Sequence, residues 1–421
     1  MRLRTTTRYL DPKSSSARQA QQAHLVFPDG ITRETIRRHP HIPSQDRGQG
    51  SHLVDVDGDE RIDFLFNYTS LIHGHCYPPV ASAIAEQANR IGAVSFPSGL
   101  EERLGQELLK RVAIQPGRIR LVNSGTEAVM LAIQTAREAT GRSKILRFDG
   151  CYHGSLLPLR RNRGSVRVGA EEVLCAFNDP AEAQGTFERE GDHLACVLLD
   201  PFPSRGALAP ARPEFLDVIE SLRRRHGVLL VVDEVMTSRV AYQGATSQLD
   251  LAPDLICLGK YIGGGLPVGA IAMRPELAVL FSWESGPAIA HGGTFNGNPL
   301  TMAAGIACLS HLNDEQIRRV NELTALFCAE LRAVFSARRT DWTVRHAGSL
   351  FHLWPQTRLP MSPEEAHDPR ARRRLGELAF FLLCHGVVLA PSGLGCLATT
   401  TQASDVEYLL SAVRQYLLHA A

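Results

Sequence analysis

The sequence predicts an α/β fold, in which helices cover a mostly parallel sheet. From about residue 118, short strand-like runs alternate with amphipathic helical stretches, which is typical of strand–helix–strand units. Several of these runs, such as 228–232, are apolar throughout, as expected for strands buried on both faces. From about residue 310 the pattern becomes helical and then mixed, which indicates a second domain.

These changes divide the chain into an arm, a large domain and a smaller α+β domain built from both chain ends. The arm is 1–26, the smaller domain is 27–90 with 311–421, and the large domain is 91–310. In the smaller domain, apolar and polar residues alternate around an Asp-Gly turn in 52–64, which predicts a β-hairpin. A last helix is predicted near 405–419.

The composition excludes several classes of function. A formal net charge of +1 over 421 residues gives no sign of nucleic-acid binding or of an anionic membrane surface. The nine cysteines show neither a CxxC pair nor metal-like spacing with histidine, so we expect no metal site and a reduced, cytoplasmic setting. The first residues lack an apolar stretch, and we therefore expect no secretory signal.

Two polar residues stand at the ends of neighbouring strand-like runs. Asp233 ends the apolar run before Glu234, where open α/β sheets place ligands, and a carboxylate buried there needs a cation. Lys260 ends the next run and enters the loop Gly263–Gly265, where partial desolvation favours the neutral amine that imine formation needs. Taken alone, each could instead be an ordinary turn acid or a surface lysine.

Two glycine-rich segments offer sites for an anion. In 123–128 a strand runs into a hydroxyl-bearing turn that opens a helix, and free N–H groups beside Thr126 would suit a phosphate. A plain helix cap is the alternative for that segment. The loop 292–299 adds a further hydroxyl, Thr294. A phosphate cradle, an acid and an imine-forming lysine are together what an enzyme must provide around pyridoxal 5'-phosphate (PLP).

These motifs resemble the class III aminotransferases, which are PLP enzymes of fold type I. The resemblance runs from about residue 27 to 415, and five motifs carry it: NSGTEA, GCYHG, DEVMTSR, LGKYIGGGLPVGA and GGTFNGNP. Within this class, the residues of these motifs are most similar to those of the β-amino-acid (β-phenylalanine-type) aminotransferases and of glutamate-1-semialdehyde 2,1-aminomutase. The resemblance implies transfer of an amino group between a small-molecule donor and a keto acid acceptor by ping-pong chemistry.

The resemblance also implies roles for individual residues. Lys260 would form the aldimine with PLP and move the proton, and Asp233 would pair with the pyridine nitrogen. The remaining cofactor contacts would be Val235 and Tyr152 on the two ring faces, Gly125 and Thr126 at the phosphate, and Thr294 at the phosphate of the neighbouring subunit. A homodimer with shared active sites is therefore implied. His153 and Glu127 lie in the motifs, and either could be functional or structural.

Two residues are candidates for the substrate. Arg33 stands where the β-amino-acid enzymes carry an arginine for the substrate carboxylate, with Arg37 and Arg38 as rivals. Tyr68 falls at an aromatic pocket position of both groups, although it could equally be a core tyrosine. The segment 390–400 is small and weakly polar, which would leave room for a bulky or apolar substituent.

Departures from the family's pattern weigh against the aminomutase as the closer relative. The aminomutase has a long mobile loop after its CYHG motif, whereas the segment between Gly154 and Phe177 is short; 390–400 also lacks the aminomutase's acid. Asp200 stands where the family usually has glutamate. A two-substrate aminotransferase is therefore the first hypothesis and intramolecular amino transfer the second. A silent PLP-fold binding protein is less favoured because the motifs are intact. A nicotinamide dehydrogenase is weaker still, because no GxGxxG follows an early strand.

Overall fold

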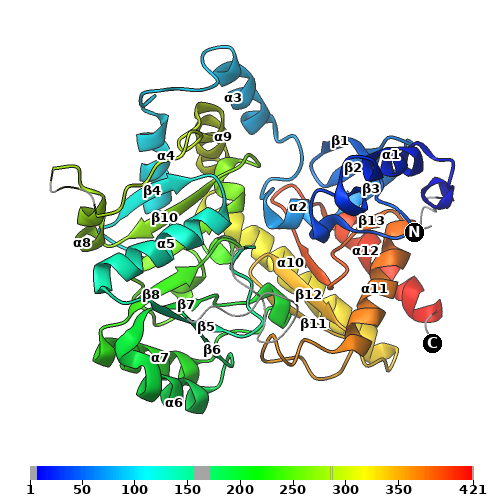
Figure 1. The fold of residues 1–421 in the computed structure, drawn as a ribbon. Helices are drawn as coiled ribbons and strands as arrows, with labels where there is room; N and C mark the ends of the chain where they lie inside the picture. Colours follow the sequence, from blue (N-terminus) through cyan, green and yellow to red (C-terminus); the bar gives the residue numbers. More distant parts are fainter. Residues whose placement is uncertain (1–6, 156–170, 285, 287, 420–421) are drawn as a thin grey trace. The chain divides into compact units, whose positions relative to one another are not determined.

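A computed structural model describes residues 7–155, 171–284, 286 and 288–419. The chain forms two compact units (Figure 1). The large unit is Pro78–Asn321 with Leu359–His367, and the small unit contains the rest. Helix α3 (Pro78–Ala88) packs on α9 (Pro299–Ser310), and both belong to the large unit.

A seven-stranded sheet forms the centre of the large unit. Its order is β4-β10-β9-β8-β7-β5-β6, and β5 to β9 run parallel. The strands are β4 (Arg118–Val122), β5 (Lys144–Phe148), β6 (Glu172–Cys175), β7 (Leu194–Leu199), β8 (Leu229–Asp233), β9 (Leu255–Gly259) and β10 (Gly269–Met273). Strand β10 is antiparallel to both of its neighbours. Every residue of β7 is buried, so both faces of the sheet are covered. The predicted mostly parallel α/β sheet is confirmed.

The helices of the large unit are α3, α4 (Leu100–Leu109), α5 (Gly125–Thr140), α6 (Pro180–Glu190), α7 (Pro213–His226), α8 (Pro275–Ala278) and α9. Of these, α4, α5, α6 and α7 contact strands of the sheet. Helix α5 contacts five of the strands and buries Ala128, Ala132 and Ala136 at four-residue spacing. Their small side chains let the helix lie close to the sheet, and this places the start of α5 beside the strand ends.

The small unit contains two smaller sheets. The first has the order β1-β2-β3-β13 and the second β11-β12-β14. The strands are β1 (Gln45–Gln49), β2 (His52–Asp55), β3 (Glu60–Asp63), β11 (Thr343–Ala347), β12 (Leu350–Trp354), β13 (Val387–Val388) and β14 (Leu394–Cys396). Strands β2 and β3 form the predicted hairpin.

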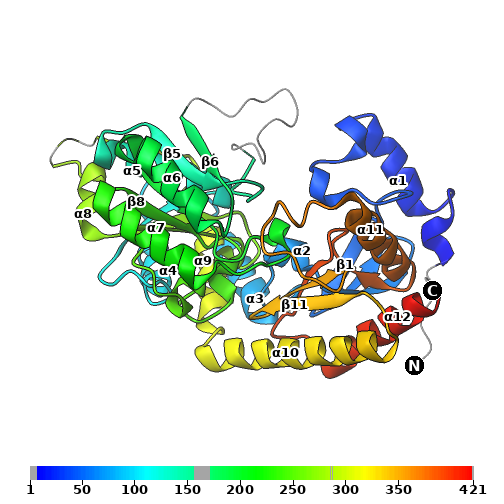
Figure 2. The same ribbon diagram turned by 90° about the horizontal axis from the view of Figure 1, so that it is seen from below.

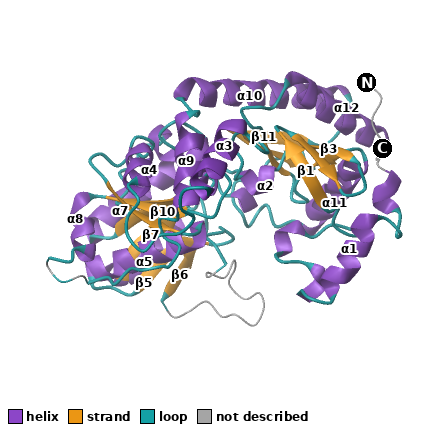
Figure 3. Ribbon diagram, turned by 90° about the horizontal axis from the view of Figure 1, so that it is seen from above, coloured by secondary structure: helices purple, strands orange, loops and turns teal. Residues whose placement is uncertain are grey.

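Helices flank the sheets of the small unit. They are α1 (Ser15–His24), the single turn α2 (Phe66–Thr69), α10 (Asp314–Ala337), α11 (Pro369–Cys384) and α12 (Ala403–His419). Strands lie between α11 on one side and α10 with α12 on the other (Figures 2 and 3). The boundary between the units falls within α10. Across the described ranges, no helix has the length and apolar character needed to span a membrane.

The N-terminal arm is folded onto the small unit from residue 7. Ser14 caps α1 by accepting a hydrogen bond from the Ala17 N–H, and Tyr9 is buried. The carboxylate of Asp57, in the hairpin turn, accepts from the N–H groups of Ser15 and Ser16 at 2.6 and 3.0 Å. The arm therefore packs on its own chain.

The small residues of 390–400 are enclosed by core side chains. A Cβ at Gly395 would lie 2.2 Å from Cζ of Phe351, and Phe351 is fully buried. Cys396 and Ala398 are also buried. The expectation that this segment leaves room for a bulky substituent is therefore wrong, because Phe351 of the neighbouring strand β12 fills the space.

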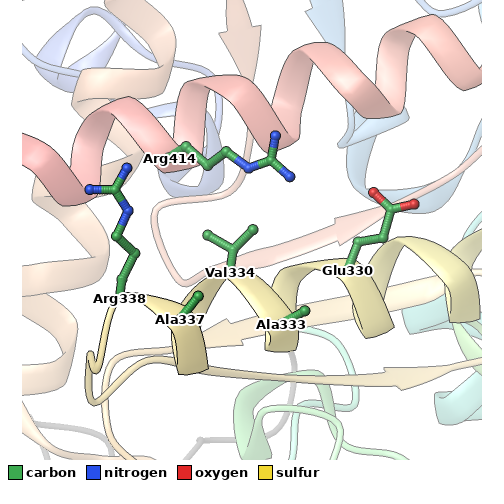
Figure 4. Close-up of a pocket in the computed structure, with 6 residues that line it drawn as sticks. All are labelled: Glu330, Ala333, Val334, Ala337, Arg338 and Arg414. Atoms are coloured by element: carbon green, nitrogen blue, oxygen red, sulfur yellow. The ribbon is translucent and has the colours of Figure 1, made fainter.

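A shallow groove of about 450 Å³ lies between α10 and α12 (Figure 4). Glu330 and Arg338 of α10 and Arg414 of α12 line it, together with apolar residues of α10. None of the residues proposed from the sequence for catalysis or binding lies in this groove, so it is separate from the candidate site.

Glu234 is a buried carboxylate that ties β8 to a turn. It accepts hydrogen bonds from the N–H groups of Ala245 and Thr246 at 3.0 and 2.8 Å, and also from the Thr246 hydroxyl. A side chain at Gly244 would collide with it. Burial raises the pKa of the Glu234 carboxyl to about 7, although these donors act in the opposite direction.

We expect Gly395→Ala to lower the free energy of unfolding by about 1–3 kcal/mol, because the new methyl group overpacks the core against Phe351. Gly376→Ala is the matched control, since nothing lies within 4 Å of that position in α11. This control should stabilise the protein by about 0.5–1 kcal/mol. Urea unfolding measures the free energy of unfolding of both variants. Equal effects would contradict the close packing of Gly395 against Phe351.

Stability should fall as the pH rises from about 4.5 to about 7, because folded Glu234 retains a proton that the unfolded chain has lost there. Relative to Glu234→Gln, which cannot titrate, the wild type should lose about 3 kcal/mol across this window. Urea unfolding at pH 5 and pH 8 measures the difference. Glu377→Gln, on the exposed face of α11, should leave the wild-type pH profile unchanged. If the free energy of unfolding changed with pH in the same way in the wild type and in Glu234→Gln, the raised pKa of Glu234 would be refuted.

Candidate active site

Asp233 lies at the carboxyl end of β8 with both carboxylate oxygens bonded. Oδ1 accepts from the Val235 N–H at 3.0 Å, and Oδ2 lies 2.8 Å from Nδ1 of His153. Asp233 and His153 are both buried. The His153 Nε2 is also buried and has no hydrogen-bond partner in the part of the chain that the structure describes. One end of the imidazole therefore holds the carboxylate, and the other is left to bond a group from outside these residues.

A second carboxylate and the lysine lie close to Asp233. Burial, followed by the charge of Asp233, raises the pKa of Asp200 well above its usual range, while Lys260 acts to lower it. Strands β7, β8 and β9 are neighbours and parallel, so Asp200, Asp233 and Lys260 follow adjacent strand ends. A buried carboxylate such as that of Asp233 is costly unless it is paired with donors or a cation, and a protonated pyridine nitrogen would be a suitable partner.

Lys260 adopts an unusual backbone conformation directly after β9. Its φ of 58° lies in the left-handed region, which residues other than glycine and asparagine rarely adopt. Such backbone strain is frequent at active sites. The sequence contains three other lysines. Lys110 and Lys144 form ion pairs with Glu107 and Glu190, and the third, Lys13, is exposed on the N-terminal arm.

The loop before α5 meets the lysine strand at close range. A Cβ at Gly259 would lie 3.4 Å from the backbone N of Gly125 and 3.2 Å from Val235. A Cβ at Gly125 would collide with Val235, at 2.6 Å. Gly125 therefore needs to be glycine, whereas at Gly259 a side chain would be only tightly packed. The structure therefore brings Gly125, Val235 and the residue before Lys260 together.

The N-terminus of α5 presents the N–H groups proposed for the phosphate. The first N–H groups of a helix, here those of Gly125 and Thr126, have no intrahelical acceptor. The Ser124 Oγ accepts from the Glu127 N–H at 3.1 Å, while Glu127 Oε2 accepts from the Asn123 N–H at 2.9 Å. Glu127 is therefore bonded to the segment before α5, and the anion site expected at Gly125 and Thr126 stays a prediction.

Tyr152 lies on the loop that also carries His153. Its side chain is partly exposed, and the Arg205 guanidinium lies 5.4 Å from its ring centroid. A Cβ at Gly154 would collide with the side chain of Thr126, at 2.6 Å from its hydroxyl oxygen, so this loop also reaches the start of α5. The segment after Gly154 that was compared with the aminomutase loop lies largely outside the described residues.

Thr294 is exposed on the loop between η9 (Val279–Phe281) and α9. Asn296 of the same loop is bonded to the segment before α5, because its Oδ1 accepts from Asn123 Nδ2 at 2.8 Å. A groove of about 520 Å³ beside this contact is lined by Glu101, Arg120 and His291 among others. The loop is thus held to the proposed phosphate site while Thr294 faces outward.

The two substrate candidates lie in the small unit. Nη2 of Arg33 donates to Oδ1 of Asn67 at 2.5 Å, and the Tyr68 hydroxyl donates to the Thr35 carbonyl at 2.7 Å. Tyr68 is half-buried rather than part of the core. Arg33 and Tyr68 therefore belong to one cluster of contacts.

The rival arginines have other partners. Arg37 forms ion pairs with Asp29 at 2.7 Å and Glu34 at 2.8 Å. Arg38 donates to two backbone carbonyls, at 2.8 and 3.2 Å. Arg33 makes no ion pair within the described ranges.

His153, Asn123 and Asn296 are site residues that the sequence left without a firm role. His153 was visible in the CYHG motif, but its partner Asp233 is far away in the sequence. The Asn123–Asn296 contact joins two of the quoted motifs, and only folding shows that they touch.

The sequence profile described as "Aminotransferase class-III" matches residues 36–159 and 169–370. An omega-transaminase from Sphaerobacter thermophilus is 35% identical, with a TM-score of 0.93 over 98% of this chain and 99% of that one. A β-phenylalanine aminotransferase from Variovorax paradoxus is 32% identical, with a TM-score of 0.92 over 97% and 95%.

A glutamate-1-semialdehyde aminomutase from Pseudomonas aeruginosa PAO1, solved in complex with PMP, is also similar. It is 28% identical, with a TM-score of 0.88 over 96% of this chain and 94% of that one. The family profile covers most of the sequence, and the match to two transaminases above 30% identity extends along almost its whole length. The chain therefore belongs to the class-III aminotransferases, which are PLP-dependent enzymes.

Proposed function

We propose that the protein transfers the amino group of a carboxylate-bearing amine, such as a β-amino acid, to a keto acid in two half-reactions. The observation that carries this proposal is the cluster at the strand ends, where Lys260 and Asp233 meet the start of α5. The names of the omega-transaminase and β-phenylalanine aminotransferase neighbours support amines whose amino group is distant from the carboxylate.

The residues of the large unit fit PLP. Gly125 and Thr126 would bind its phosphate through the N-terminus of α5. Val235 and Tyr152 would contact the two ring faces, and Asp233 would hold the ring nitrogen in its protonated form. His153 orients Asp233 from behind, with its Nδ1 2.8 Å from Oδ2. When bound, PLP supplies the electron sink for the carbon that loses its proton.

Lys260 is the residue proposed to carry the proton. Its amine would be the attachment point of the cofactor and, once displaced by substrate, the general base and then the general acid at the reacting carbon. The left-handed backbone at Lys260 lies directly after the end of β9.

Arg33 is the proposed ligand of the substrate carboxylate, and Tyr68 would line the same pocket. This choice is favoured over Arg37, because two carboxylates already neutralise the Arg37 side chain. A planar guanidinium binds a carboxylate through two parallel hydrogen bonds, which would set the orientation of the amino group.

The second candidate function is the intramolecular transfer of an aminomutase, and the similarity to the Pseudomonas enzyme favours it. The segment 390–400 supplies no acid for that reaction. The two functions are separated by adding an amino donor alone. An aminotransferase then stops after the first half-reaction until a keto acid is supplied, whereas an aminomutase continues without one when the donor is its own substrate.

We also propose a homodimer that works in the cytoplasm. Trp283, Phe96 and Phe295 of the large unit are 87, 82 and 63% exposed, and burying such side chains against a second copy would stabilise a dimer. Phe295 follows Thr294, the residue proposed to reach the partner's phosphate.

Lys260→Ala should lower the rate of amino transfer by about 100- to 10,000-fold or more, because the variant loses the proton carrier. Stopped-flow absorbance of the loaded protein with an amino donor measures this half-reaction. Lys144→Ala is the control, since Lys144 forms a surface ion pair with Glu190. Wild-type rates in Lys260→Ala would disprove the role.

Phe295→Glu should weaken self-association by about 2 kcal/mol or more, because a charge would replace a large apolar side chain in the dimer contact. Light scattering coupled to size exclusion, run over a dilution series, measures the change. A wild-type protein that remains monomeric at micromolar concentration would contradict the proposed assembly.

A further inference from the structure

The turn that carries Tyr68 has a rare backbone conformation. Phe66, Asn67, Tyr68 and Thr69 have φ values of 47, 50, 55 and 72°, so four consecutive residues with side chains lie in the left-handed region. Left-handed residues normally occur singly, because Cβ then approaches the following carbonyl. A run of four persists only where its surroundings impose it, and such strain is concentrated at functional sites.

Hydrogen bonds to the buried Asp63 and the burial of Phe66 anchor this turn. The Asp63 carboxylate accepts hydrogen bonds from the Leu65 and Phe66 N–H groups at 2.7 and 3.0 Å, and its other oxygen lies 2.8 Å from His75 Nε2. The Phe66 side chain is fully buried. The turn is therefore anchored on its inner side, and its outer side is free to present Asn67 and Tyr68.

Both presented side chains reach one short segment. Asn67 binds the Arg33 guanidinium and Tyr68 binds the Thr35 carbonyl, at either side of the start of η3 (Glu34–Ile36). Because arginine can only donate, the amide oxygen of Asn67 must face it. The left-handed turn thus fixes both the segment and the direction of the Arg33 side chain.

Arg33 is bonded to a neutral side chain, whereas the nearby Arg37 is bonded to charged ones. Arg37 is bonded to two carboxylates, which cancel its charge. Asn67 is neutral and its bond engages Nη2 alone, so Arg33 keeps its full charge and its other N–H groups for a ligand. A neutral acceptor orients a guanidinium without competing for the anion that it is to bind.

We propose that Asn67 is a positioning residue for carboxylate recognition, which holds Arg33 extended toward the carboxylate of a β-amino acid. The proposal rests on the proposed role of Arg33 as the carboxylate ligand. It gives the strained turn a function, because this left-handed turn presents the Asn67 amide oxygen to Arg33 while Phe66 stays buried.

Two substitutions separate positioning from structure. Asn67→Gly keeps the left-handed backbone and removes the amide, whereas Asn67→Asp keeps the shape and adds a charge that would pair with Arg33. The probes are aminooxyacetate, which has the atom spacing of a β-amino acid, and methoxyamine, which lacks the carboxylate. Both react with bound PLP whatever the natural substrate, and absorbance follows the reaction.

The readout is the ratio of the rate constants for the two probes. We expect Asn67→Gly to lower this ratio by about tenfold, since Arg33 loses a charge-assisted bond. Asn67→Asp should lower it further, to the level of Arg33→Gln. Methoxyamine rates and melting temperatures should stay at wild-type values. Arg37→Gln is the matched control and should leave the ratio unchanged.

The outcomes distinguish the inference from the function on which it rests. A structural role for Asn67 predicts that the isosteric Asn67→Asp is the milder variant, and that result would overturn the inference. An unchanged ratio in Arg33→Gln would also overturn it, by removing the role of Arg33. A wild-type protein that takes up no PLP would instead refute the proposed function.

Discussion

The architecture of the site depends on one constraint, which is that the Asp233 carboxylate is buried and must be compensated. A buried carboxylate is costly without donors or a cation. The Val235 N–H and His153 supply two hydrogen bonds, and neither removes the demand for positive charge. Asp200 is also buried nearby, and burial raises its pKa well above the usual range, so the demand for a cation rests on Asp233. We infer that a protonated ring nitrogen meets this demand.

The sheet order turns that local constraint into a reaction site. Strands β7, β8 and β9 are adjacent and parallel, so Asp200, Asp233 and Lys260 follow ends that lie side by side. Glycines at 125 and 259 then allow the start of α5 to touch the Lys260 strand. The anion site, the acid and the lysine are thus brought within reach of one small cofactor, because the strands are adjacent and because residues 125 and 259 are glycines.

Much of this organisation could be predicted from the sequence, because its signals are local. Apolar strands, a strand-end acid and a helix-opening turn are each read within a few residues. What could not be predicted depends on distant partners: the pairing of His153 with Asp233, and the closure of the segment 390–400 by Phe351. The left-handed run at Phe66–Thr69 is also hidden, because the letters FNYT contain no glycine to signal it.

The most direct test of the account is to locate the lysine that bears the cofactor. Borohydride reduction of the PLP-loaded protein, followed by peptide mass analysis, chooses among the four lysines of the sequence. The account predicts that the reduced cofactor is found on Lys260 alone, and that an added amino donor protects this residue from labelling. Label on Lys13, Lys110 or Lys144, or a protein that binds no PLP, would contradict the assignment of the active site.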